Sequence, residues 1–129
     1  MKHLIAIAAL ICLPMIAVAE ATTTVTPLLS KALADAEGRE VTMLEVRYAP
    51  GAVDPIHRHD AQVFVYVLEG EIVMQVRGGA ETRLKAGQTF YETPTDVHVV
   101  GRNASSSKPA RFLAFFVKQK DAAILTPTQ

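Results

Sequence analysis

The chain has a single cysteine, Cys12, near its N-terminus. A disulfide needs two cysteines, so no bridge within one chain can staple this domain, although small exported domains often depend on such bridges. Neither sign of charge is in excess, since 13 basic residues face 13 acidic ones. This balance gives no indication of a nucleic-acid partner or of an anionic membrane surface. Stability must therefore come from burial, from oligomerisation or from a bound metal.

Several signatures of catalysis and of larger architecture are also missing. The sequence contains no nucleophile elbow, no phosphate-binding loop and no dinucleotide fingerprint. It has no internal repeat, no coiled-coil heptad pattern and no linker between domains. These absences favour one domain whose chemistry comes from some other arrangement of side chains.

Residues 1–19 have the pattern of a signal peptide. A short polar start precedes the apolar run 4–18, and small residues before Glu20 predict cleavage there. A membrane anchor is the alternative, but the 15 residues of the run fall short of the roughly 20 that a spanning helix needs. A lipoprotein signal is a second alternative because Cys12 lies in the run, although the bulky Ile11 precedes it where a small residue is expected. We expect a periplasmic or secreted protein with no membrane contact after cleavage.

The expected mature chain, residues 20–129, is long enough for one domain with a real core but not for two. We divide it into an N-terminal leader (20–40), a folded domain (41–118) and a C-terminal tail (119–129). Within the leader, residues 27–36 have leucines on one side and a proline near the start, which predicts a short helix. An extended leader is the alternative. The tail is polar, and we expect it to be loose or to wrap an edge.

The folded domain alternates between short apolar runs and turns. Leu44, Val46 and Tyr48 share one face of an expected strand, and turn residues recur every eight to twelve positions. This pattern predicts six to nine strands in an all-β barrel or sandwich. Two runs, 62–68 and 110–117, are apolar on both faces, so something must cover their outer side. The N-terminal segment or a second subunit could do so, and the second possibility is the basis for expecting a homodimer.

The histidines give the clearest functional signal. Of the four in the sequence, the three outside the predicted signal segment are His57, His59 and His98. The first two are separated by one residue, which on a β-strand places both imidazoles on the same face. Three imidazoles suit a divalent transition metal. The alternative is that they are ordinary half-buried residues with satisfied hydrogen bonds. Asp54 and Asp60 flank the pair as candidates for hydrogen bonds to a ring N–H or for turn caps.

Two stretches of the sequence resemble the two motifs of the cupin superfamily. The residues that carry the first are Gly51, His57, His59, Glu69 and Gly70, and those that carry the second are Gly87, Asp96, His98 and Asn103. The resemblance covers residues 41–117. It implies an all-β double-stranded β-helix, which is a small jelly-roll barrel, with a divalent metal near its mouth. His57, His59 and His98 match the metal-binding histidines of the two motifs.

The sequence departs from the cupin pattern at one ligand position. The family's glutamate falls seven residues before Gly70, where this chain has Val63, and valine cannot bind a metal. Gln62 could supply an amide oxygen as a fourth ligand, but in a regular strand it points away from the histidine face, and only a bulge would turn it inward. Thr93 and Thr95 replace a proline and a glycine in the second motif, which we interpret as local changes at turn positions.

Three neutral ligands leave the double charge of a metal uncompensated, which is more typical of a catalytic centre than of a closed structural site. The set is similar to that of cupin dioxygenases. We therefore expect an exported metal-binding cupin with a small organic substrate, and the resemblance implies an oxygenase. A sensory or storage module that binds a metal or small ligand without turnover is the alternative, and a purely structural subunit is a third. The sequence identifies no catalytic residue, nor does it distinguish iron, zinc, manganese, nickel and copper.

Overall fold

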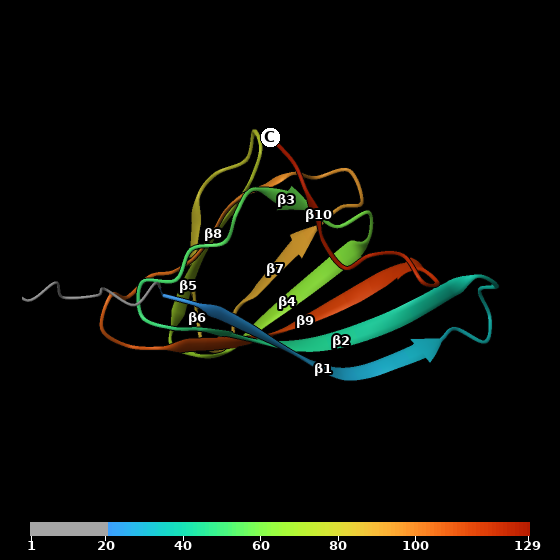
Figure 1. The fold of residues 1–129 in the computed structure, drawn as a ribbon, viewed down its shortest axis with the longest axis horizontal. Coiled ribbons are helices and arrows are strands. Elements are labelled where there is room, and N and C mark those ends of the chain that lie inside the picture. Colours follow the sequence, from blue (N-terminus) through green and yellow to red (C-terminus); the bar gives the residue numbers. More distant parts are fainter. Residues whose placement is uncertain (1–20) are drawn as a thin grey trace, which may run out of the picture.

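The computed structural model describes residues 21–129, so the predicted signal segment lies outside the described residues. The described part forms two five-stranded antiparallel sheets that face each other (Figure 1), with strand orders β1-β2-β9-β4-β7 and β10-β3-β8-β5-β6. This arrangement confirms the predicted all-β fold, although the ten strands of the described residues exceed the six to nine that the sequence pattern predicts, because β3 and β10 have only two residues each. Within residues 21–129 no helix is long and apolar enough to cross a membrane.

The strands keep these labels below. The first sheet contains β1 (Thr23–Ala32), β2 (Arg39–Tyr48), β4 (Gln62–Glu69), β7 (Thr89–Glu92) and β9 (Ala110–Gln119). The second contains β3 (His57–Arg58), β5 (Glu71–Val76), β6 (Thr82–Lys85), β8 (His98–Asn103) and β10 (Thr126–Pro127).

The inner faces of the two sheets meet in one apolar core. Side chains alternate along each strand, and the inward ones are the apolar residues that the sequence pattern predicts. From the first sheet these include Leu44, Val46, Tyr48, Val63, Val65, Val67, Phe112 and Phe116, and from the second Ile72, Met74 and Leu84. The predicted inward face of residues 44–48 is therefore confirmed.

The N-terminal leader is a strand. Residues Thr23–Ala32 form β1, which pairs antiparallel with β2 and has an irregularity between Pro27 and Leu29. The short helix expected over residues 27–36 is therefore wrong, whereas the extended alternative is correct. Leu28 and Leu29 are each 48% exposed, so the apolar side that indicated a helix is not buried. The free edge of β2 offers a ladder of hydrogen bonds, which satisfies the backbone better than a helix of fewer than three turns would. An edge strand also tolerates a proline.

The outer face of the first sheet carries exposed aromatic side chains. Phe64, Tyr66 and Tyr91 are 45%, 43% and 46% exposed, and the rings of Phe64 and Tyr91 are 5.1 Å apart. Strand β1 does not cover them, because β2 and β9 separate it from β4. From Ala21 on, the N-terminal segment is therefore not the cover that the sequence pattern of residues 62–68 led us to consider.

The C-terminal segment returns to the end of the barrel where β3 begins (Figure 1). Thr126 and Pro127 pair with Arg58 and His57, which makes β10 the edge strand of the second sheet. Ile124 packs against the core just before this strand. The segment thus contributes directly to the region that contains the paired histidines.

Candidate metal centre

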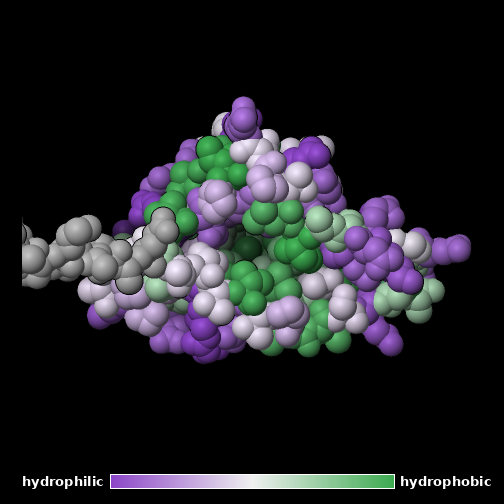
Figure 2. Space-filling model, viewed as in Figure 1, coloured by the Kyte–Doolittle hydropathy of each residue, from purple (hydrophilic) through white to green (hydrophobic). Residues whose placement is uncertain are grey.

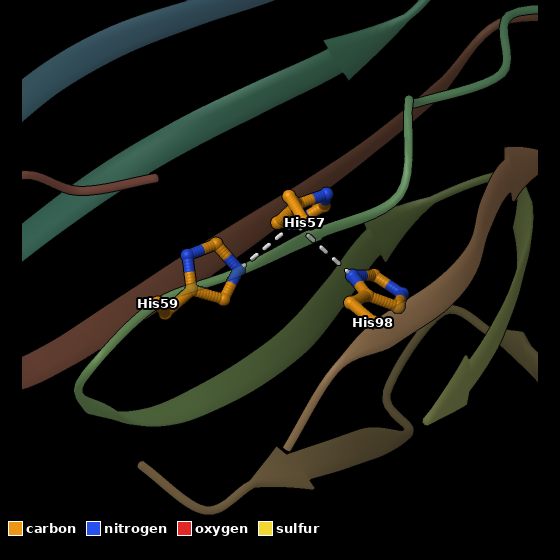
Figure 3. Close-up of side chains that lie close together, drawn as sticks. All are labelled: His57, His59 and His98. Carbon is orange, nitrogen blue, oxygen red and sulfur yellow. Dashed lines mark hydrogen bonds between the residues drawn. The ribbon is translucent and has the colours of Figure 1, made fainter. Parts of the chain in front are cut away.

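Three histidines converge in a cavity between the two sheets, and Figure 3 shows their rings turned toward one another. His57 on β3 and His98 at the start of β8 are register partners, while His59 follows β3 directly. One ring nitrogen from each residue lies within 4.8 Å of the other two. His57 and His98 are 3% and 4% exposed, and the side chain of His59 is 10% exposed. The predicted juxtaposition of the three residues is confirmed.

Backbone carbonyls orient two of the rings. The Nδ1 of His57 lies 2.7 Å from the carbonyl oxygen of Pro55, and the Nδ1 of His59 lies 2.6 Å from that of Ile124. A carbonyl oxygen can only accept a hydrogen bond, so Nδ1 carries the proton in both rings. In the neutral rings, Nε2 then holds a lone pair directed into the cluster.

Two such lone pairs are unfavourable neighbours unless a cation lies between them. The Nε2 atoms of His57 and His59 are 3.0 Å apart, and the Nδ1 of His98 lies 3.3 Å from the Nε2 of His57. Nitrogen ligands of a tetrahedral ion with bonds of about 2.0–2.1 Å are roughly 3.3 Å apart. Both the spacing and the fixed tautomers therefore fit a divalent metal ion, with the two carbonyls holding the imidazoles in position as metal-binding histidines require.

Burial keeps two of these rings neutral. Desolvation lowers the pKa of His59 and that of His98 to about 4, from an ordinary value of 6.5. A neutral imidazole binds metals, whereas an imidazolium cannot. At neutral pH these two histidines are therefore available as ligands without first losing a proton.

Glu92 is a member of the cluster that the sequence analysis missed. It ends β7 and is 2% exposed, with Oε2 3.8 Å from the Nε2 of His59 and Oε1 3.8 Å from the Nδ1 of His98. Burial, helped by the charge of Asp96, raises its pKa to about 7. Strand alternation could have located it, because Phe90 packs against the core and the residue two positions later must face the same way.

Gln62 does not join the histidines. Its Oε1 accepts a hydrogen bond of 3.3 Å from the hydroxyl of Tyr91, on the outer face of the sheet. The pairing of β4 with β9 is regular from Gln62 to Val67, so no bulge turns the amide inward. Val63, at the position where cupins have a glutamate, is 1% exposed and lines the cavity.

The two aspartates that flank the paired histidines have other partners. Asp54 accepts hydrogen bonds from the hydroxyl of Tyr48 and, at 2.8 Å, from that of Thr23. Burial and the charge of Asp54 raise the pKa of Tyr48 well above its usual value, which keeps this hydroxyl a donor. The Oδ1 of Asp60 lies 3.5 Å from a guanidinium nitrogen of Arg58, so this aspartate forms an ion pair. Neither aspartate orients an imidazole; that role belongs to the backbone carbonyls.

The histidines border a cavity of about 300 Å³. Figure 2 shows a hollow on the viewed face with hydrophobic side chains inside it and along part of its rim. The apolar lining comes from both ends of the chain and includes Val25, Leu44, Val46, Val65, Met74, Phe112, Ala114, Ile124 and Leu125. Polar side chains are concentrated at the histidines and Glu92, with Tyr48 and Asp54 nearby. Such a cavity can hold a small molecule with an apolar body and direct its polar end at the cluster.

Without metal, the stability of the protein should depend on pH in a way that the cluster determines. His59 and His98 have a folded-state pKa of about 4, so their contribution to stability is lost as the pH falls from 6.5 through 4. Glu92, with a folded-state pKa of about 7, contributes the opposite slope, because the folded state binds its proton more tightly between pH 4.5 and 7. Each of the three pKa shifts corresponds to roughly 3 kcal/mol of unfolding free energy. Because the two histidines destabilise the protein on acidification and only Glu92 opposes them, the net effect is a loss of stability.

We therefore expect the metal-free protein to lose roughly 3 kcal/mol of unfolding free energy between pH 6.5 and pH 4. Urea unfolding in the presence of a chelator measures this loss. Glu92→Gln removes the opposing slope and should make the loss steeper. A stability that is flat or rises on acidification would contradict this account of the cluster.

Comparison with known proteins agrees with the fold. The protein-family description "Cupin domain" matches residues 44–116, and no curated protein matches the chain. An uncharacterised protein with a double-stranded β-helix domain from Klebsiella pneumoniae is similar in structure, with a TM-score of 0.63, 22% identity and 85% of each chain covered.

Two structures of enzymes also share the fold. The DMSP lyase DddQ from Ruegeria pomeroyi has a TM-score of 0.68 and 20% identity, over 82% of this chain and 51% of the lyase. An oxalate oxidase in complex with glycolate has a TM-score of 0.63 and 23% identity, over 81% of this chain and 54% of the oxidase. The chain thus spans about half the length of these two enzymes. Because the family match extends over more than half of the sequence and the fold is a double-stranded β-helix, this chain belongs to the cupin domain family.

Proposed function

We propose that this protein is an exported cupin that binds a divalent metal through His57, His59 and His98. The observation that carries this proposal is the approach of the Nε2 atoms of His57 and His59 to 3.0 Å while both Nδ1 protons are held by carbonyls. Neutral rings in these tautomers repel each other unless a cation accepts both lone pairs.

The chemistry that we propose is oxidation of a small organic molecule, with the protein acting as a metal-dependent oxygenase. A bound divalent metal would act as a Lewis acid and would present open positions to a small ligand. The chain supplies the rest: carbonyls that orient the imidazoles, and apolar walls that exclude water and strengthen the electrostatic interactions of the site.

The cavity supports a small substrate with an apolar body and an oxygen-bearing end. Its volume of about 300 Å³ is at the lower end of ligand pockets, and the polar groups gather on the histidine side. Two structures of the same fold are named for action on small molecules, one as a DMSP lyase and one as an oxalate oxidase. They support the size class of the substrate.

Metal or ligand binding without turnover is the second candidate function. It is favoured by the shortage of unengaged acid–base groups in the cavity, since Glu92 is 2% exposed and Asp54 accepts hydrogen bonds from the hydroxyls of Tyr48 and Thr23. Oxygen uptake with acetylacetone, cysteine and catechol separates the two candidates. Uptake that depends on His57 supports the oxygenase, whereas thermal stabilisation by one of these compounds without uptake supports the binding module.

Export and dimerisation belong to the same proposal. Export rests on the signal pattern of residues 1–19, and its test is cleavage before Glu20 in cells that carry the full-length chain. Dimerisation rests on the exposed outer face of β4 and β7, which includes Phe64, Tyr66 and Tyr91. Light scattering tests it, and a strictly monomeric chain would rule it out.

Metal analysis tests the central claim. Residues 20–129, purified without a polyhistidine tag and dialysed against zinc, should bind one equivalent per chain. His57→Ala and His98→Ala should lose it, because each removes one of three ligands. Gln62→Ala is the matched control and should bind as wild type does, since Gln62 lies on the outer face. A wild-type protein without stoichiometric metal would overturn the proposal.

A further inference from the structure

We propose that Glu92 replaces the glutamate missing at position 63 and serves as the fourth protein ligand of the metal. This inference rests on the proposed metal-binding function and deepens it. It assigns a ligand that neither motif of the sequence indicates, and it changes the expected charge of the centre.

The register of the first sheet places Glu92 where the lost side chain would have been. Val63 on β4 and Glu92 on β7 are direct antiparallel partners. Residues directly opposite each other project to the same face, with Cβ atoms about 4.5–5.5 Å apart. A carboxylate on β7 can therefore reach the region that a glutamate at position 63 would occupy, but from the neighbouring strand.

The carboxylate oxygens approach the nitrogens assigned as metal ligands. Oε2 of Glu92 lies 3.8 Å from the Nε2 of His59, and Oε1 lies 3.8 Å from the Nδ1 of His98. These separations are too long for hydrogen bonds. They are close to the distance of roughly 3.3 Å between two ligand atoms of one tetrahedral ion, so a small rotation of the side chain brings an oxygen into the ligand sphere.

The surroundings of Glu92 contain no protein group that satisfies its charge. Its Oε2 is buried without a hydrogen-bond partner in residues 21–129. The ion pairs recorded for it in that part of the chain involve only His59 and His98, and no lysine or arginine lines the cavity. Burial of an uncompensated carboxylate is costly. A metal ion held by the neighbouring histidines would supply the compensating charge.

A fourth, anionic ligand alters what the centre prefers. Three neutral imidazoles leave a divalent ion with its full double charge, whereas one carboxylate halves it. Carboxylate oxygen also shifts the preference toward harder ions such as manganese, compared with an all-imidazole set. The centre is therefore a mixed nitrogen and oxygen site whose oxygen comes from Glu92, whereas the oxygen ligand considered from the sequence was the amide of Gln62.

Cobalt(II) titration of the untagged chain tests this assignment, since cobalt reports both affinity and ligand set through its visible absorption. Glu92→Gln should weaken cobalt binding by about 100-fold or more, because losing even a partner of a ligand costs about 10–100-fold. The saturated spectrum should also change. Glu81→Gln, which removes a half-exposed carboxylate paired with Arg102, should leave the affinity and the spectrum as in wild type.

A swap of the two partners separates ligation from a structural role. The double variant V63E/E92V returns a carboxylate to the same face from β4, and it should recover the affinity to within about tenfold of wild type. Loss of a merely structural contact would not be rescued by this exchange. Unfolding of the metal-free variants in urea controls for folding, and Glu92→Asp offers a second variant with the charge retained.

The outcomes distinguish this inference from the proposed function. If wild type and Glu92→Gln bind cobalt equally and give the same spectrum while His98→Ala does not bind, the three-histidine site stands and Glu92 is not a ligand. If wild type itself fails to bind cobalt and zinc, the metal function fails first. Weak binding by Glu92→Gln with rescue in the swap supports the fourth ligand.

Discussion

Zinc at 1,000 times its dissociation constant is expected to raise the free energy of unfolding of residues 20–129 by about 4 kcal/mol. The reason is that the site exists only in the folded chain. Its three histidines come from β3, the residue after β3 and β8, and the pairing of His57 with His98 joins positions 41 residues apart. An ion that binds only the folded state stabilises it by mass action. Urea unfolding with zinc and with a chelator measures the difference.

Two variants show where the stabilisation comes from. His57→Ala should abolish the response to zinc, because it removes the ring whose Nε2 lies near both neighbours. Arg58→Ala is the matched control: its exposed side chain lies between the two histidines in sequence and pairs with Asp60 instead. An equal response to zinc in wild type and His57→Ala would mean that zinc acts elsewhere.

The parts of the site that sequence predicts are those determined by local spacing. One residue between His57 and His59 puts both rings on the same side, and the second motif supplies His98. Glu92 escaped because its role depends on the register between β4 and β7, where it faces Val63. Such a pairing is a property of two strands that are distant in sequence. Alternation along β7 predicts that the side chain of Glu92 points into the barrel, but it does not predict that Val63 lies opposite.

The same distinction applies to the ends of the chain. Residues 27–36 carry a periodicity too short to decide between helix and strand, and the free edge of β2 decides it. The tail looked like a polar extension, yet the carbonyl of Ile124 accepts the Nδ1 proton of His59. A backbone carbonyl has no sequence signature, so no reading of residue types could have placed it. By contrast, the alternation of the β2 residues was sufficient to predict which side chains face the core, because a core position requires only apolar neighbours and no particular partner.

The side chain of Asn103 joins three segments at the end of β8, and its removal should be strongly destabilising. It is 4% exposed. Its Nδ2 donates to the carbonyls of Ala49 and Lys108 at 3.0 and 2.8 Å, and its Oδ1 accepts the N–H of Ser105 at 2.9 Å. Asn103→Ala leaves these backbone groups without their partner. We expect it to lower the free energy of unfolding by about 3 kcal/mol, since each buried group left unpaired costs about 1–3 kcal/mol.

Asn103→Asp provides a sharper version of the same experiment. It keeps the shape and the bond from Ser105 but turns an oxygen toward the two carbonyls, so at pH 7 it should destabilise at least as much as Asn103→Ala. Gln75→Ala is the control, because its amide also donates to a carbonyl, that of Gly79 at 2.9 Å, but at the surface; its effect should stay within about 0.5 kcal/mol. A small effect of both Asn103 variants would show that the loops near the end of β8 are held by other contacts. The cobalt affinity of folded Asn103→Ala should remain that of wild type, since Asn103 is not among the residues that line the cavity. The stability of the barrel can therefore be measured separately from the ligand set of its metal centre.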